Sequence, residues 1–259
     1  MGLYVEVAGR GPPLVLLHGW GLHGGVFAPL VARLSARFQL HLVDLPGHGR
    51  SRESSTSLTL HDCAAQILRQ TPAAPWLGWS LGGLVALHAA TVSAQVRALA
   101  LVASTPRFVR AADWPHAVEP EVFVQFARDL EQDHASTLQR FLALDTMGSD
   151  HARSELRTLK DTLYARGEPS AQALRQGLAL LQDSDLRAAL PGLRIPSLGL
   201  SGRRDRLVPP SAMAAAAVAA GGCHVDVAGG GHAPFLGHAD QVVHHLLAFL
   251  HDAGMDAPR

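Results

Sequence analysis

The chain has 259 residues, 47% of them hydrophobic, and its 22 basic side chains balance 22 acidic ones. This length allows one α/β domain with a sizeable core, and the neutral balance provides no overall positive field for nucleic acid or an anionic membrane. The two cysteines, Cys63 and Cys223, lie far apart and suggest neither a disulfide framework nor a thiolate metal site. With no signal peptide, myristoylation motif or uninterrupted apolar span, we expect a cytoplasmic protein, and separately we expect it to be a monomer.

Short β-rich runs alternate with longer helical patterns, which predicts strands joined by crossover helices in a mostly parallel sheet. Strands are expected at 3–7, 14–18, 39–44, 75–79, 97–104, 196–202 and 224–229. The central strands are almost wholly apolar, as is typical of strands covered on both faces. Helical periodicity is present at 27–38, 58–70, 81–92, 211–220 and 240–252.

Residues 107–190 interrupt this alternation. They carry helical patterns at 121–133, 136–147 and 152–166 and no convincing strand. An all-helical insertion between two strands of a parallel sheet indicates a lid over the edge of the sheet. We therefore expect a core made of residues 1–106 and 191–259, with a helical lid at 107–190.

Ser80 stands at the centre of the sequence GWSLG, residues 78–82. The residues before it end a predicted strand and those after it begin a predicted helix, which is the setting of a nucleophile elbow. The glycines allow a tight turn without Cβ clashes. A plain glycine-rich turn is the alternative, and the strand-turn-helix setting argues against it.

A serine hydroxyl needs a base and an orienting carboxylate to act as a nucleophile. His232 follows the last predicted strand in a glycine-rich loop, and Asp205 follows the strand before it. The order Ser80, Asp205, His232 is that of α/β hydrolases. Other candidates are expected at the surface, in packing positions or in the lid: His238, His244, His245, His251, Asp183 and Asp185.

An oxyanion formed at Ser80 requires hydrogen-bond donors. We expect the backbone N–H of Leu81 to be one donor and that of Trp20, in the loop after residues 14–18, to be the second. The Trp20 indole is expected to line the acyl pocket, although simple packing under the lid is an alternative. His18 is expected to hold its loop in shape, and the turn at 44–51, with its Asp and His, is expected to be architectural.

The sequence has no HExxH, GxGxxG or P-loop motif, so we expect hydrolysis without a metal or cofactor. The segments LVLLHGWG, DLPGHGRS, LGWSLGGLVALHAA, RFLALDTMGS, SGRRDRLVP and GGGHAPFLGH together resemble the pimeloyl-acyl-carrier-protein methyl ester esterases, lidded α/β hydrolases of biotin synthesis. The resemblance runs from about residue 3 to about residue 250. It implies a serine carboxylesterase that removes a methyl group from a carrier-bound pimeloyl chain.

The resemblance also implies which residues contact the substrate. These are Trp20, Ser80, Leu81, His232 and the stretch Phe141, Leu142, Ala143, Leu144 and Asp145. A glutamine is expected at the position of Asp145, so a carboxylate there departs from the pattern. The alternative for this stretch is an amphipathic helix that faces the core.

An acidic acyl-carrier protein would need a local basic patch on this neutral chain. Arg153, Arg157 and Lys160 share one helix face, and Arg140 of the preceding helix is a fourth candidate. The alternative is a solvated surface, because Asp150, Glu155 and Asp161 lie nearby.

Three other functions remain open from sequence. A general short-chain esterase or carbon–carbon hydrolase would share the triad and act on small soluble substrates. A cofactor-free perhydrolase would depend on peroxide. A ligand sensor of the same fold would carry no activity.

Overall fold

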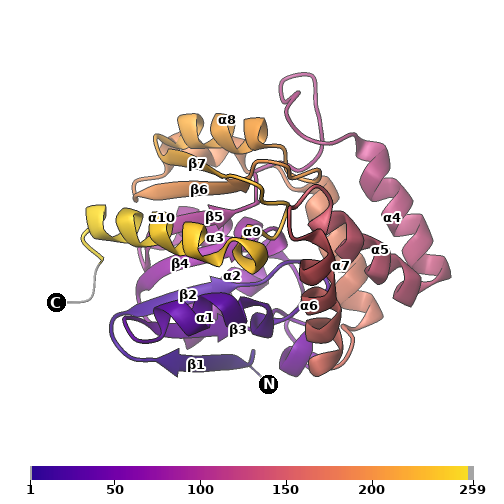
Figure 1. The fold of residues 1–259 in the computed structure, drawn as a ribbon, viewed down its shortest axis with the longest axis horizontal. Helices are drawn as coiled ribbons and strands as arrows, with labels where there is room; N and C mark the ends of the chain where they lie inside the picture. The colour runs from indigo at the N-terminus through magenta and orange to yellow at the C-terminus, as the bar shows by residue number, and fades with distance from the viewer. Residues whose placement is uncertain (1, 256–259) are drawn as a thin grey trace.

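The computed structural model of the protein describes residues 2–255, and residues 1 and 256–259 of the predicted core lie outside them. A seven-stranded sheet in the order β1-β3-β2-β4-β5-β6-β7 forms its centre (Figure 1). Every neighbouring pair is parallel except β1 and β3. The strands are β1 (Val5–Gly9), β2 (Pro13–Leu17), β3 (Gln39–Val43), β4 (Ala74–Trp79), β5 (Val96–Val102), β6 (Ser197–Gly202) and β7 (Cys223–Val227). All seven predicted strands are present.

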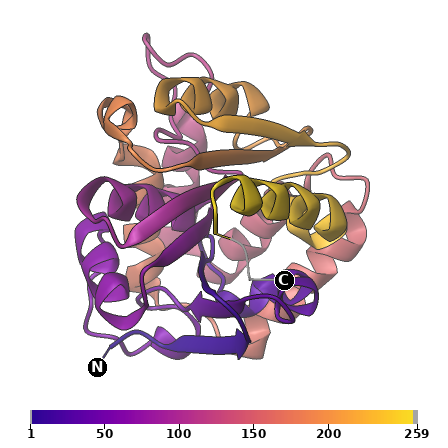
Figure 2. The ribbon, with the colours of Figure 1, turned by 90° about the vertical axis from the view of Figure 1, so that its left-hand side faces the viewer.

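Helices cover both faces of the sheet (Figures 1 and 2). The helices α1 (Ala28–Leu34) and α10 (Ala239–Asp252) pack together on one face. The helices α2 (Leu60–Gln70), α3 (Leu81–Val92) and α8 (Pro210–Ala220) lie on the other. Every residue of β4 and most residues of α3 are buried, because both elements lie inside the core. Their junction, where Ser80 stands, is therefore held firmly on both sides.

Three predicted elements are too long at their carboxyl ends by two residues or more, and one of them is the strand expected over 224–229, since β7 ends at Val227. The helix expected over 27–38 ends at Leu34, whose carbonyl accepts hydrogen bonds from the N–H groups of Arg37 and Phe38. The strand expected over 97–104 ends at Val102, because Ala103 has a φ of 44° that a strand does not allow. These last two differences are local turns that hydrophobic periodicity does not record.

The insertion, meaning the segment between β5 and β6, is helical. It contains α4 (Pro120–Gln132), α5 (His134–Thr146), α6 (Ala152–Ala165) and α7 (Ala171–Asp183), which stand together at one end of the sheet (Figure 1). Beyond the three helices predicted here, α7 is a fourth. Short helices complete the described chain: 3-10 turns at Gly24–Phe27, Gly49–Ser51 and Arg187–Gly192, and α9 (Pro234–Gly237). Within residues 2–255, no helix has the length and apolar character needed to span a membrane.

Candidate active site

Ser80 occupies a sharp turn between β4 and α3. Its backbone has a φ of 53° and a ψ of −120°, a strained conformation for a residue with a side chain. The turn fits tightly against β2, since a Cβ at Gly82 would lie 2.3 Å from the carbonyl oxygen of Leu17. The Ser80 N–H donates to Val102 O at 3.0 Å, and Ser104 Oγ donates to Ser80 O at 2.8 Å. The elbow geometry predicted for this serine is present.

Three side chains from three loops form a hydrogen-bonded chain. His232 Nε2 lies 2.9 Å from Ser80 Oγ, and His232 Nδ1 lies 2.8 Å from Asp205 Oδ2. All three are buried. Asp205 Oδ1 accepts the backbone N–H groups of Leu207 at 2.8 Å and Val208 at 3.0 Å, which fixes its carboxylate. With Nδ1–H donated to that carboxylate, Nε2 is left to accept the proton of the serine hydroxyl.

The charge environment strengthens His232 as a base. Burial opposes the charged form of its imidazole, but the carboxylates of Asp205 and Asp145 favour that form, and together they raise the pKa of His232 above its ordinary value. The loop of His232 is fixed from two sides: its N–H donates to Asp145 O at 2.9 Å, and Trp79 Nε1 donates to its carbonyl at 2.8 Å.

Two supporting residues were not singled out in the sequence, Trp79 and Ser104. Trp79 contacts the carbonyl of the histidine, and Ser104 contacts the carbonyl of the serine. Trp79 is the residue next to the serine inside GWSLG, and Ser104 comes two residues after β5. Their positions beside strand ends are the only signal that sequence offers, because the contacts cross between elements far apart in the chain.

The backbone N–H groups of Leu81, next to Ser80, and of Trp20, in the loop after β2, stay predictions as oxyanion donors. Leu81 is the first residue of α3, where backbone N–H groups have no partner within the helix. Trp20 is buried against the insertion: its Nε1 donates to Leu174 O of α7 at 2.9 Å, and its ring centroid lies 4.6 Å from that of Phe141. Gly177 of α7 makes room for the indole, since a Cβ there would lie 2.5 Å from Trp20 Cδ1.

His18 and the turn at 44–51 hold the neighbouring loops, as expected. The Leu45 N–H donates to His18 Nε2 at 2.9 Å, so His18 Nδ1 carries the proton and donates to Gly19 O at 2.7 Å. Burial lowers the pKa of His18 well below its usual value, which keeps the ring neutral. Asp44 accepts the N–H of Gly24 at 2.8 Å and that of Arg50 at 2.9 Å.

The predicted substrate-contact stretch on α5 divides between two faces of the helix. Phe141, Leu142 and Asp145 are buried, Leu144 is half-buried, and Ala143 is exposed. Five successive residues of a helix cannot point to one side, because each is rotated by about 100° from the last. The buried side of α5 faces the site, since Asp145 Oδ1 lies 4.0 Å from His232 Nε2. The alternative expected for this stretch, an amphipathic helix with its apolar side toward the core, fits the same buried residues.

The four basic candidates for carrier docking lie on the outside of the insertion. Arg140, Arg153 and Arg157 are exposed, and Lys160 is half-buried. Arg140 is paired with Asp129 of α4 at 2.5 Å. A hollow of about 400 Å³ beside α6 includes both Arg153 and Arg157 in its lining.

The rival acids and histidines lie away from the serine's hydrogen-bonded chain. Asp183 is exposed at the end of α7, as expected. Asp185 differs from the expectation of an ordinary solvated charge: it pairs with Arg107 at 2.9 Å and Arg187 at 2.7 Å, and these contacts bring its pKa to about 2. His238 is the N-cap of α10, and the other three histidines lie within that helix: His244, His245 and His251.

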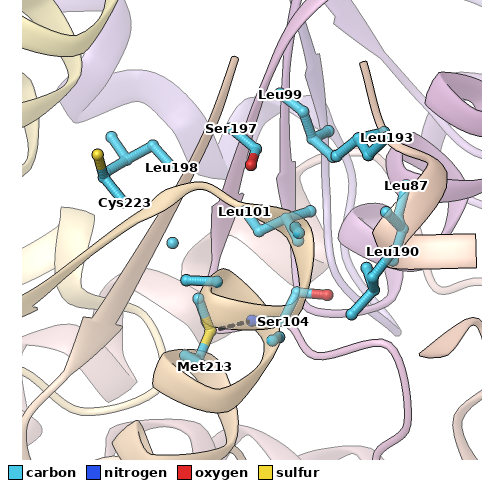
Figure 3. Close-up of a pocket in the computed structure, with 14 residues that line it drawn as sticks. Leu87, Leu99, Leu101, Ser104, Leu190, Leu193, Ser197, Leu198, Met213 and Cys223 are labelled. Carbon is cyan, nitrogen blue, oxygen red and sulfur yellow. Dashed lines mark hydrogen bonds between the residues drawn. The ribbon is translucent and has the colours of Figure 1, made fainter. Parts of the chain in front are cut away.

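A small apolar cavity lies behind the elbow, between β5, β6, α3 and α8 (Figure 3). Leu101 and Leu190 are among its lining residues, and Met213 Sδ accepts the Ser104 N–H at 3.1 Å beside it. Its volume is about 20 Å³, which is too small for an acyl chain. Across residues 2–255, no group of three or more His, Cys, Asp or Glu side chains is arranged to hold a metal ion.

A sequence profile of the α/β-hydrolase fold matches residues 12–239. The chain belongs to the α/β-hydrolase family. It is 62% identical over 249 residues to the pimeloyl-acyl-carrier-protein methyl ester esterase of Xanthomonas oryzae pv. oryzae, a match that covers 96% of this chain and 98% of that one. The esterase of the same name from Stenotrophomonas maltophilia is 61% identical, with 96% of each chain covered. The resemblance inferred from the sequence motifs is confirmed.

Solved structures of other α/β hydrolases share the fold. An esterase from Exiguobacterium antarcticum superposes with a TM-score of 0.86 at 24% identity, over 96% of this chain and 95% of that one. An enol-lactonase from Burkholderia xenovorans gives a TM-score of 0.82 at 24% identity, over 96% of both chains. At this identity the likeness concerns the arrangement of strands and helices and not the substrate.

Proposed function

We propose that the protein is a serine carboxylesterase of biotin synthesis that hydrolyses the methyl ester of a pimeloyl chain on acyl-carrier protein. The observation that carries the proposal is the buried hydrogen-bonded chain Ser80–His232–Asp205 at a strained elbow. The relatives that match this chain over almost its whole length bear the name of that activity. The helical segment 107–190 acts as the lid over this site.

Acylation begins when Ser80 Oγ attacks the ester carbonyl. His232 Nε2 takes the hydroxyl proton, and Asp205 stabilises the imidazolium that forms. The backbone N–H groups of Trp20 and Leu81 donate to the tetrahedral oxyanion. When the intermediate collapses, the bond to the methoxy oxygen breaks, His232 returns the proton to that oxygen, and methanol leaves an acyl-serine.

Deacylation repeats these steps with water. His232 Nε2 removes a proton from a water molecule as its oxygen attacks the acyl carbonyl, and the same two N–H groups stabilise the second oxyanion. The bond to Ser80 Oγ then breaks and the serine recovers its proton from His232. The free carboxylic acid leaves, with the chain still attached to its carrier.

The basic face of α6 is proposed as the docking surface for the acidic carrier, with Arg153 and Arg157 at its centre. Three nearby acids argued for a surface without net positive charge, but the charges of two of them are not available to offset the arginines. Glu155 is buried, where its carboxylate accepts the hydroxyl of Ser149 at 2.8 Å, and the exposed Asp150 is paired with Arg204. Lys160 lies on the same helix, and Arg140, which pairs with Asp129 of α4, is a further candidate. Exposed charges of this kind mainly raise the association rate, and salt weakens them.

The function is tested with two substrates, the methyl ester of carrier-bound pimelate and a small p-nitrophenyl ester. The wild-type enzyme should strongly prefer the carrier-bound ester, and Ser80→Ala should abolish turnover of both. Arg153→Glu with Arg157→Glu should lower kcat/KM for the carrier-bound ester by about tenfold, a loss of about 1.4 kcal/mol. The small ester should be hydrolysed as before. Equal turnover of both substrates by the wild type would contradict the proposal that the substrate is carrier-bound. An equal loss of turnover on both substrates in the charge-reversed variant would contradict the proposed docking surface.

A further inference from the structure

Asp145 brings a second carboxyl group to His232. Its side chain is 1% exposed, and neither of its oxygens has a hydrogen-bond partner within residues 2–255. Leaving a buried carboxyl unpaired in this way is costly in free energy, and more so when it is ionised. Its Oδ1 nevertheless lies 4.0 Å from His232 Nε2, the nitrogen that also contacts Ser80 Oγ.

The position of Asp145 is fixed by the fold and not by a flexible loop. It lies in the last turn of α5, and its own carbonyl accepts the backbone N–H of His232 at 2.9 Å. Phe141, one turn earlier, packs against the Trp20 ring on the same buried face. The main chain of Asp145 therefore holds the base while its side chain approaches the ring.

The charges that act on Asp145 come from the hydrogen-bonded chain itself. Burial raises its pKa to about 7, the positive form of His232 lowers it, and the negative charge of Asp205 raises it. Around α5, the exposed Arg140 is paired with Asp129 of α4.

Two other charged groups near this end of the insertion have partners of their own. Glu155 of α6 accepts the hydroxyl of Ser149, and Arg204, in the loop after β6, is paired with Asp150. We therefore expect His232 and Asp145 to titrate as one coupled pair.

We propose that Asp145 is a positioning residue for the proton of His232: from 4.0 Å its carboxylate favours the imidazolium, and near neutral pH the pair carries one proton, on one side chain or the other. The proposal rests on the function proposed above. The exchange is balanced through solvent: the proton that Nε2 of the imidazolium releases is matched by one that the Asp145 carboxylate takes up, giving a neutral imidazole and a neutral carboxyl. Only the form with neutral His232 can accept the proton of Ser80.

The sign of the effect follows from the charge. An ionised Asp145 favours imidazolium, so His232 keeps its proton to a higher pH than it would beside a neutral group. Asp145→Asn removes this negative charge with little change of shape. The imidazolium of the variant loses its proton at a lower pH, and activity appears earlier as the pH rises. A neighbouring charge at this distance shifts a pKa by about one unit or more.

The test is the pH profile of kcat/KM for a small p-nitrophenyl ester from about pH 5 to about pH 9, which reports the free enzyme's base. The midpoint of the acid limb should fall by about one unit in Asp145→Asn. Glu155→Gln is the matched control, because it also removes a buried carboxyl from the insertion, and its midpoint should equal that of the wild type. An unchanged midpoint in Asp145→Asn would overturn the proposal.

A measurement on the unmodified protein covers the case in which Asp145→Asn does not fold. In a carbon-13 NMR titration, the Asp145 carboxyl should titrate near neutral pH together with the His232 ring. A carboxyl that titrates near its usual value of about 4 would overturn the proposal. The outcome is separate from the proposed function, since hydrolysis that survives in Ser80→Ala contradicts that function, whereas an inert Asp145 leaves serine-dependent hydrolysis intact.

Discussion

Replacing Arg166 with Met removes the cationic partner of a carboxylate buried in the core. Arg166 caps the carboxyl end of α6, and its Nη1 lies 3.2 Å from both oxygens of Asp44. The Asp44 side chain is 0% exposed and that of Arg166 14%. Breaking a buried pair from one side costs about 3–5 kcal/mol. Because Asp44 keeps two backbone N–H donors, we expect the lower end, about 3 kcal/mol, which for a chain of this size lowers Tm by about 6–12 °C.

Urea unfolding followed by circular dichroism measures this loss, and Arg33→Met is the control. Arg33 pairs with Asp240 at 2.6 Å, but the two side chains are 36% and 87% exposed, so this variant should be scarcely less stable than the wild type. The midpoints should therefore separate clearly. If Arg166→Met loses no more stability than Arg33→Met, the pair with Asp44 does not stabilise the attachment of the insertion, and the reasoning from burial is wrong.

The remaining predictions concern the hydrogen-bonded chain. Ser80→Ala and His232→Ala should each lower kcat by several orders of magnitude. The double variant should have a kcat scarcely lower than either, because the two residues act as a unit. Additive losses would show that they act separately. Asp205→Asn should lower kcat by about 10⁴-fold with the fold retained, since an amide can hold His232 in the wrong tautomer. Asp183→Asn, at an exposed position, should behave as wild type in the same assay, and a loss there would point to a different orienting acid.

The order of elements could be predicted from the sequence because each signal is local. The strands β2, β4 and β5 are apolar runs between turn residues, and the GWSLG motif lies at the junction that such motifs require. The ends of elements were less predictable. Ala103 ends β5 because its φ is positive, and nothing about an alanine in the sequence indicates a positive φ. The helix α7 carries Gly177 at its centre, a residue that weakens a helical pattern and is needed for the contact with Trp20.

Site residues could be predicted where the reaction requires a particular residue type. They were harder to predict where the packing of helices determines which side chain reaches the site. Ser80, Asp205 and His232 follow three parallel strands whose carboxyl ends share one edge of the sheet, and a parallel sheet could be expected from the sequence. Asp145 lies four residues after Phe141, which places both on one helix face, but a carboxyl at such a position contradicts the hydrophobic pattern. Its approach to His232 depends on how α5 meets the loop after β7, and only the fold gives this.

The hydrogen bond from the backbone N–H of His232 to Asp145 O joins the loop that carries the histidine to helix α5 of the insertion. Trp79 holds the same loop from the core side, so the histidine is aligned by two elements that belong to different parts of the fold. A movement of α5 away from the sheet breaks one of these supports. The alignment of His232 therefore depends on a helix of the insertion as well as on the core.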